Sequence, residues 1–262
     1  MLIGICAYAA VGLFFALTVR KFLYFAKMPL HGRMELYPVP GEPGRSHGGS
    51  YMENPEWWRR ERRTDKAAEF SEMLKEILLI KRLRENSRAI WWASYPFHLG
   101  LYLLAAWTVL LVFAALTGLT GGIVFALTAL TGYGGFACGL LGALLLLVRR
   151  IADEHYRVYT TPQEFLNLGL LIALLLTGLC AWGGGFAKAQ DFMGGVLRLQ
   201  AAAPDLMTGV HLALLFALFI YIPLSKMSHY VGKYYSFHHF LWDNAPNLKG
   251  TKVAEEIARG SK

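Results

Sequence analysis

Five long apolar runs dominate the pattern of hydrophobic and polar positions along the chain. Each holds roughly 20 largely apolar residues, enough to cross a bilayer core of about 30 Å as a helix. We expect helices, because an open strand cannot satisfy its backbone hydrogen bonds in lipid. The pattern therefore predicts an all-α membrane protein with a five-transmembrane-helix bundle. The predicted spans are Leu2–Val19, Ile90–Leu116, Gly122–Val148, Phe165–Trp182 and Leu206–Leu224.

The last apolar run leads into a polar stretch that carries a second histidine. We expect one helix over Asp205–Ser236, with His211 and His229 near its two ends. Their spacing is about five turns at 3.6 residues per turn, so both imidazoles would project from one face, roughly 27 Å apart along the axis. Ionisable side chains in membrane helices are costly and are often functional.

A further histidine, His98, lies on the second predicted span. A lone histidine in an apolar helix commonly packs and forms hydrogen bonds without binding a ligand. Imidazoles on two facing helices are also what axial ligation of haem requires. The pattern favours haem ligation and leaves the packing role as the alternative.

The charge distribution predicts the topology. The formal net charge is +8, and 15 of the 26 Lys and Arg residues lie between Arg20 and Arg88. The positive-inside rule then predicts the N-terminus outside and the C-terminus inside. We attribute the excess positive charge to this topology and expect no nucleic-acid partner.

The segment between the first two spans contains a second kind of helix pattern. Within residues 55–86, apolar side chains such as Phe70, Leu74 and Ile77 recur at helical spacing with charges between them. This predicts an amphipathic helix that lies on anionic lipid or offers a docking face to a partner. The predicted segments are a first transmembrane helix (1–19), a cytoplasmic basic loop with this helix (20–89), a four-helix haem-binding membrane region (90–236) and a cytoplasmic tail (237–262).

Cysteines and glycines narrow the chemistry. The three cysteines form no CxxC or CxxCH pair, which argues against covalent c-type haem, an iron–sulfur cluster and a zinc site in this chain. The third span carries a run of glycines that either allow close helix approach or leave room for a flat macrocycle, and we favour close approach. These glycines are Gly132, Gly134, Gly135, Gly139 and Gly142.

Polar residues at the span ends are further candidates. Arg149, Arg150 and Lys226 are cofactor-binding candidates that could pair with haem propionates, although basic residues there also serve topology. Thr161 followed by Pro162 is typical of a helix start. On the opposite, outer side of the membrane, four polar residues are candidates for contact with a quinone. The simpler interpretation is that they are ordinary loop residues. They are Lys188, Gln190, Asp191 and Asp205.

Several motifs together resemble a known family. FHLG around His98, the run HLALLFALFIYIPLSKMSH from His211 to His229 and the five-span layout resemble the gamma subunit of respiratory nitrate reductase, a dihaem cytochrome b that oxidises quinol. The segment YTTPQEFLNL, residues 159–168, looks closer to the cytochrome b subunits of sulfate-reducer menaquinol complexes and of membrane heterodisulfide reductases. The likeness covers the five spans and not the long 20–88 segment.

The resemblance implies ligand assignments. His98 and His229 correspond to the two ligands of the haem nearer the cytoplasm, and His211 corresponds to one ligand of the outer haem. The position of its partner is Thr108, which cannot ligate iron as imidazole does. The outer haem could thus be absent, be held by His211 alone or take another ligand. Counting residues from the span ends also leaves a His98–His211 pair open.

The resemblance also implies a function. We expect a cytochrome b subunit of a quinone-linked respiratory complex in the cell inner membrane, with haem b as cofactor and menaquinone as substrate. Menaquinol would react near the outer leaflet. The partner would be a cytoplasmic iron–sulfur subunit of the heterodisulfide-reductase type. Other membrane or periplasmic cytochrome subunits and membrane lipid would be further partners. The reverse electron flow fits equally well. The alternative is a non-redox membrane anchor or transporter subunit.

Overall fold

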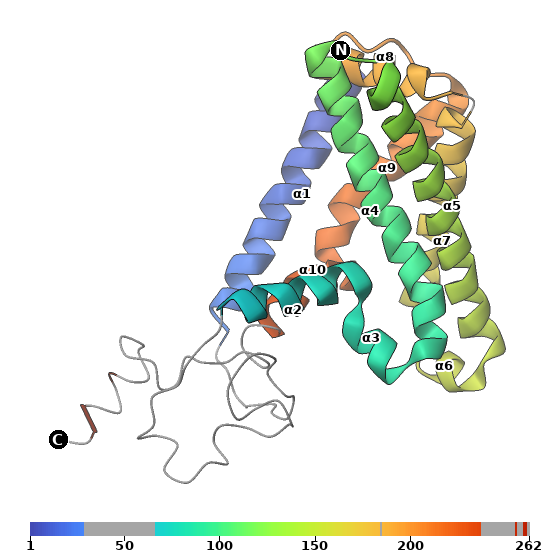
Figure 1. Ribbon diagram of the computed structural model, residues 1–262. Helices are drawn as coiled ribbons and strands as arrows, with labels where there is room; N and C mark the ends of the chain where they lie inside the picture. Colours follow the sequence, from blue (N-terminus) through green and yellow to red (C-terminus); the bar gives the residue numbers. More distant parts are fainter. Residues whose placement is uncertain (29–65, 184, 237–254, 256–258, 261–262) are drawn as a thin grey trace. The chain divides into compact units, whose positions relative to one another are not determined.

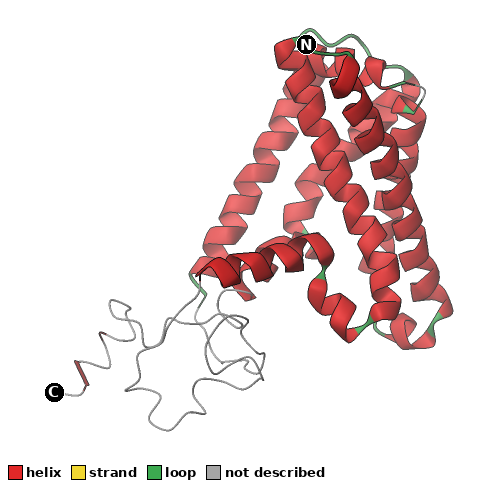
Figure 2. Cartoon of the chain, viewed as in Figure 1, coloured by secondary structure: helices red, strands yellow, loops and turns green. Residues whose placement is uncertain are grey.

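The computed structural model describes residues 1–28, 66–183, 185–236, 255 and 259–260. Within these ranges the secondary structure is helical and contains no strand (Figure 2). Five helices are long and apolar enough to cross a membrane, which confirms the predicted fold class of an all-α, multi-pass membrane protein. They are α1 (Leu2–Ala26), α4 (Arg88–Thr117), α5 (Gly122–Ala152), α7 (Pro162–Trp182) and α9 (Leu206–Leu224).

Shorter elements connect these five helices. They are α2 (Lys66–Leu79), α3 (Lys81–Asn86), α6 (Glu154–Val158), α8 (Phe186–Leu197), the 3₁₀ turn η3 (Lys226–Ser228) and α10 (His229–Ser236) (Figure 1). The chain divides into two compact units. We call Met1–Leu17 with Ile80–Met227 the bundle unit, and Thr18–Leu79 with Ser228–Lys262 the second unit.

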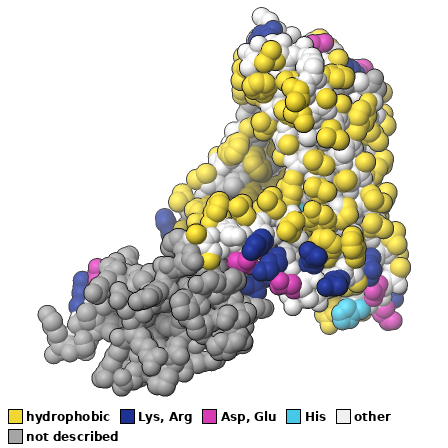
Figure 3. Space-filling view, viewed as in Figure 1, with side chains coloured by type: hydrophobic (Ala, Val, Ile, Leu, Met, Phe, Trp, Pro, Cys, Tyr) yellow, Lys and Arg dark blue, Asp and Glu magenta, His cyan; other side chains and the backbone are white. Residues whose placement is uncertain are grey.

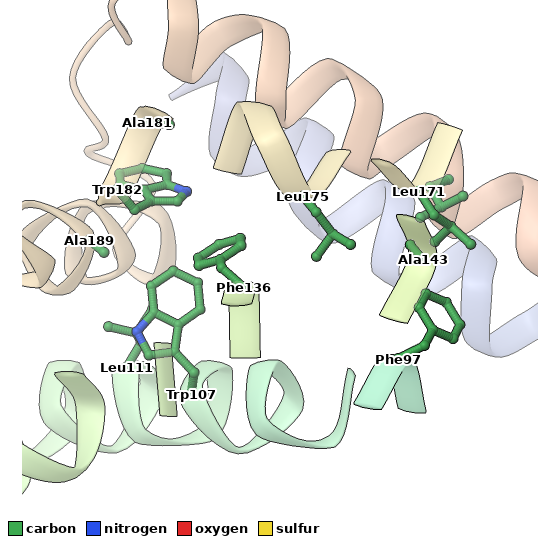
Figure 4. Packing of buried hydrophobic residues seen from close by; sticks show 11 residues of the cluster. Phe97, Trp107, Leu111, Phe136, Ala143, Leu171, Leu175, Ala181, Trp182 and Ala189 are labelled. Atoms are coloured by element: carbon green, nitrogen blue, oxygen red, sulfur yellow. The ribbon is translucent and has the colours of Figure 1, made fainter. Parts of the chain in front are cut away.

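In the bundle unit, the spanning helices pack in sequence. α4 packs on α5, α5 on α7 and α7 on α9, while α8 packs on α4. Large apolar side chains such as Trp107, Phe136 and Leu175 fill the space between α4, α5 and α7 (Figure 4). The outward faces are also apolar, and Lys and Arg gather where α4 begins and α5 ends (Figure 3). Apolar faces bounded by charge are what a lipid-exposed bundle requires.

Glycines set the distance between α4 and α5. A Cβ atom built on Gly142 would lie 2.2 Å from the backbone nitrogen of Phe97, and one built on Gly100 would lie 2.2 Å from the backbone nitrogen of Gly139. These distances are far below any van der Waals contact, so only glycine permits this approach. Close helix approach is therefore confirmed as the role of Gly139 and Gly142.

The prediction of one helix over Asp205–Ser236 is wrong. α9 ends at Leu224, and Ser225 has an extended backbone with φ −102° and ψ 179°. The Ser225 hydroxyl accepts a hydrogen bond from the Met227 N–H at 3.1 Å, as a residue that starts a new helical turn does. The break removes the geometric argument that placed His211 and His229 on one face. Pro223 followed two residues later by Ser225 is the sequence signal for it.

A second difference concerns Lys188, Gln190 and Asp191, which we expected to be ordinary loop residues. The structure contains helix α8 there. Its apolar residues Ala189, Met193 and Val196 recur at helical spacing. Ala189 is buried in the core, and Phe192 and Met193 pack against it.

The second unit is built around the end of α1. Tyr235 of α10 packs against Phe22, with ring centroids 4.9 Å apart, and its hydroxyl donates a hydrogen bond to the Phe22 carbonyl at 2.9 Å. The Tyr230 hydroxyl lies 2.9 Å from that of Thr18. α2 joins α10 through an ion pair between Glu76 and Lys233. α10 thus lies along the end of a membrane-spanning helix, and α2 is attached to α10.

The predicted amphipathic helix within residues 55–86 is present as two helices. α2 and α3 are separated at Ile80, whose backbone is left-handed with φ 50°. This conformation is unfavourable for a β-branched residue such as isoleucine, so the backbone is strained at the break between the two helices. Residues 55–65 and most of the predicted tail (237–262) lie outside the described residues.

We predict that Gly142→Ala destabilises the bundle by about 1–3 kcal/mol, because the new methyl group would overlap the α4 backbone. Gly134→Ala on the same helix is the matched control, since its Cβ would meet only Leu103 at an ordinary 3.4 Å. Thermal unfolding of the detergent-solubilised protein measures both. Equal unfolding temperatures for the two variants would contradict the close α4–α5 contact.

Candidate functional site

His98 lies on α4 with its imidazole tied to the same helix. Its Nδ1 is 2.8 Å from the Ser94 carbonyl oxygen and 3.3 Å from the Ser94 hydroxyl. A carbonyl can only accept, so Nδ1 carries the proton and Nε2 carries the lone pair. The hydrogen bond from Nδ1 to the Ser94 carbonyl also restrains the ring. Histidines that bind metals usually have such a bond at the nitrogen that does not bind the metal.

His211 lies on α9 and is buried, with 6% of its surface exposed. Its Nδ1 lies 3.3 Å from the Thr177 hydroxyl of α7. That hydroxyl donates to the Ala173 carbonyl at 2.8 Å, so it accepts from Nδ1–H. His211 therefore has the same protonation pattern as His98, with the lone pair on Nε2.

Gly178, Phe136 and Trp182 shape the space around the His211 ring. A Cβ atom on Gly178 would lie 2.8 Å from its Cε1 and 2.5 Å from Cε1 of Phe136, so the absence of a side chain there admits both rings. Trp182 packs edge-to-face on the imidazole at 6.3 Å between centroids. Figure 4 shows Phe136 and Trp182 side by side in the core near the end of α7. The pocket wall is aromatic, and the polar contacts of the ring are to the Thr177 hydroxyl and the Leu174 backbone.

The two imidazoles lie at different depths along the bundle. His211 is level with Gly178, Gly178 contacts Phe136, and the neighbouring Gly135 contacts Leu104 of α4. Leu104 is about 9 Å along the axis from His98 at 1.5 Å per residue. Side chains tilt toward the start of their helix, and α4 and α9 run in opposite directions, so the rings diverge further. Two nitrogens on one metal lie about 4 Å apart, so this geometry disfavours a shared iron.

Thr108, at the position expected for a second outer ligand, is exposed on α4. Its hydroxyl donates to the Leu104 carbonyl at 2.9 Å, as threonines in helices commonly do. Thr108 therefore serves its own helix, and His211 has no histidine counterpart at this position.

His229 is the first residue of α10 and is exposed within the second unit. His98 belongs to the bundle unit. The pairing of His98 with His229 across the two units stays a prediction.

The basic candidates at the Arg88 end of the bundle differ in their contacts. Arg150 donates to the Thr160 hydroxyl at 3.1 Å and lies 3.7 Å from Glu164, which accepts from the Thr161 N–H at 2.7 Å. It joins the end of α5 to the start of α7, and the predicted helix start at Thr161 and Pro162 is confirmed. Arg149 is partly exposed and Lys226 is exposed in η3. Propionate binding by these residues stays a prediction.

At the opposite end, Asp205 caps α9. Its carboxylate accepts from the Thr208 N–H at 2.9 Å and pairs with Lys188 at 2.6 Å. The Lys188 ammonium and the Thr208 N–H hold the pKa of Asp205 well below its ordinary value. Lys188 also lies 5.7 Å from the Trp182 ring. Of the quinone-contact candidates, these two form a structural pair, Asp191 is exposed, and Gln190 is buried at 5% exposure.

The ligand chemistry available in the described residues is limited. Among them, no group of three or more His, Cys, Asp or Glu side chains gathers as a polydentate metal site would need. Haem needs only one or two axial imidazoles, because the porphyrin supplies the other four nitrogens. The two intramembrane histidines fit that donor set.

Sequence reasoning missed the residues that orient these histidines. Ser94 could have been found, because it precedes His98 by one helical turn. Thr177, Gly178 and Trp182 carry no such signal, because their nearness to His211 depends on the register between α7 and α9.

We predict that Gly178→Ala lowers the unfolding temperature and moves the His211 ring, because its methyl group would overlap two aromatic rings. Gly169→Ala on the same helix is the control, since its Cβ would meet nothing within 4 Å. Thermal unfolding together with the imidazole NMR signals measures both effects. An unchanged His211 signal in Gly178→Ala would contradict the described packing.

We also predict a pH effect at the start of α9. A lowered carboxyl pKa stabilises the fold above the unfolded value of about 3.9, and the contribution is lost as the pH falls below it. Because Lys188 and Asp205 are both exposed, the effect should be small and should shrink with salt. The pH effect is tested by comparing the unfolding temperatures of wild type and Asp205→Asn from neutral pH to below the unfolded carboxyl pKa. The two should converge in acid, and a constant difference between them would refute the assignment.

No family model matches this chain, and no curated protein or solved structure matches it either. The family suggested by the motifs around His98 and His211 thus stays a prediction that rests on those residues.

Proposed function

We propose that this protein is a membrane cytochrome b subunit of a quinone-linked respiratory complex. The observation that carries the proposal is the pair of membrane-embedded imidazoles, His98 and His211, each with Nδ1 engaged by an acceptor. In both, the lone pair is on Nε2, the atom that would ligate iron. Haem b would supply the one-electron chemistry linking menaquinol to a cytoplasmic iron–sulfur subunit.

The structural alternative is that both histidines only pack. Their hydrogen bonds alone would satisfy that reading, because Nδ1 is paired in each. A polar ring in a membrane helix is nevertheless expensive, and a residue such as leucine would pack there without that cost. Two rings on two spanning helices, both with the same nitrogen engaged, favour ligation.

The depth difference supports two separate centres. Because the His211 ring lies about 9 Å or more from the level of His98, we assign the two to different irons. His98 would pair with His229, as the resemblance implies. His211 would hold the second haem without a histidine at Thr108, which makes a five-coordinate iron or a different sixth ligand the expected state.

The remaining parts of the proposal follow the resemblance and the charge map. Basic residues gather at the Arg88 end of the bundle, which supports placing that end in the cytoplasm. The acidic or iron–sulfur face of a partner would dock there, and menaquinol would react near the Asp205 end. The membrane would be the cell inner membrane.

A non-redox anchor or transporter subunit is the rival function. It accounts for five spanning helices and the charge distribution equally well. It gives no reason for a costly imidazole on each of two spanning helices. It also predicts a colourless protein, which makes the two functions easy to separate.

The test is a reduced-minus-oxidised visible spectrum with haem counting by pyridine haemochrome. We expect b-type bands, loss of a low-spin haem in His98→Ala, and loss of a distinct haem signal in His211→Ala. His155→Ala is the control, because His155 is exposed in α6 outside the spanning helices. A colourless wild type would refute the proposed function. Full haem content in both ligand variants would refute the ligand assignment.

A further inference from the structure

Helix α2 largely buries two acidic side chains, Glu72 and Glu76, and exposes large apolar ones. Glu76 is only 6% exposed and is paired with Lys233, and the Glu72 side chain is 12% exposed. In contrast, Phe70 is 57% exposed and Leu78 is 50% exposed. A helix on a water-facing surface has the opposite arrangement.

The exposed apolar residues form one stripe. Phe70, Leu74 and Leu78 follow one another at intervals of four residues, and Ile77 follows Leu74 by three, so the four share one face of α2. All four are exposed within the second unit. We call these four residues the α2 stripe.

The attachment of α2 indicates what the stripe meets. α2 is joined by the Glu76–Lys233 pair to α10, and α10 packs along residues 18–26 of α1 through Phe22. That part of α1 is the end of a helix apolar enough to cross a membrane. α2 is therefore held beside the point where a spanning helix ends.

The length and charge of α2 exclude a spanning role. Its 14 residues extend about 21 Å, less than the roughly 30 Å of a bilayer core. Basic residues are numerous near it in the chain or in its unit. Arg20, Lys21 and Lys27 lie at the end of α1 in the same unit, and Lys81, Arg82 and Arg84 follow α2 directly in the sequence. Apolar area flanked by Lys and Arg is the chemistry that binds an anionic lipid surface.

We propose that the α2 stripe lies in the headgroup layer of a bilayer that contains anionic lipid. The helix lies along the surface, with the stripe about 5–10 Å into the boundary between headgroups and acyl chains. Glu76 is turned away from the lipid and is neutralised by Lys233. The inference is independent of the proposed redox function, because it involves neither His98 nor His211.

Spin-label accessibility in the full-length chain tests this placement. The three native cysteines are replaced by alanine, and a nitroxide is attached to Leu74→Cys or Ile77→Cys, with Lys75→Cys as the matched control on the same helix. The protein is reconstituted into nanodiscs of phosphatidylcholine with or without phosphatidylglycerol. Collisions with oxygen, which concentrates in lipid, are compared with collisions with a water-soluble nickel complex. Circular dichroism confirms that each variant is folded.

We expect the oxygen-to-nickel ratio at positions 74 and 77 to be several-fold higher than at 75, and higher with phosphatidylglycerol than without it. Ready access of nickel to 74 and 77 would show a water-exposed stripe and overturn the proposal. Protection from both reagents would show that protein covers the stripe and would overturn it as well. Equal ratios in both nanodisc types would overturn the preference for anionic lipid.

Discussion

Contact between the backbones of α4 and α5 is the constraint on which the bundle depends. Without side chains at Gly100, Gly139 and Gly142, the two helices meet at van der Waals distance, and only one register brings these glycines opposite their partners. Lipid offers no hydrophobic drive for helices to associate, so such close packing has to supply the stability. The same register continues through Phe136 and Gly178 to α9, and so it also sets the depths of both imidazoles.

Hydrogen bonding sets a second constraint, because a polar ring in hydrocarbon must find its partners within the protein. His98 uses the carbonyl one turn earlier on its own helix, whereas His211 reaches across to Thr177 on another helix. The first solution is local, and any helical segment with that sequence can form it. The second requires α7 and α9 to be packed already, and therefore the orientation of His211 reports tertiary structure.

The difference between local contacts and contacts that depend on helix packing explains which features of the structure could be predicted from the sequence. Apolar runs define the spanning helices well, and the predicted start and end at Leu206 and Leu224 match α9. The local signal for a helix break at Pro223 and Ser225 was outweighed by the expectation that His211 and His229 share one face. That expectation favoured an unbroken helix, and the structure breaks it at Ser225. Contacts that depend on register, such as Gly178 with His211, could not be predicted, because no local pattern determines which residues of α7 and α9 meet.

Burial carries a different meaning at the edge of a membrane than in water. In α2, Glu72 and Glu76 lie inward, where Lys233 neutralises Glu76, and the four residues of the α2 stripe lie outward. In water this arrangement would lose the hydrophobic stabilisation of four large side chains and would also bury a charge. The arrangement becomes favourable only when the α2 stripe faces an apolar environment and the buried carboxylate has a countercharge, as Glu76 has in Lys233. The sequence of α2 shows an amphipathic helix, but only the structure shows which of its two faces the protein uses.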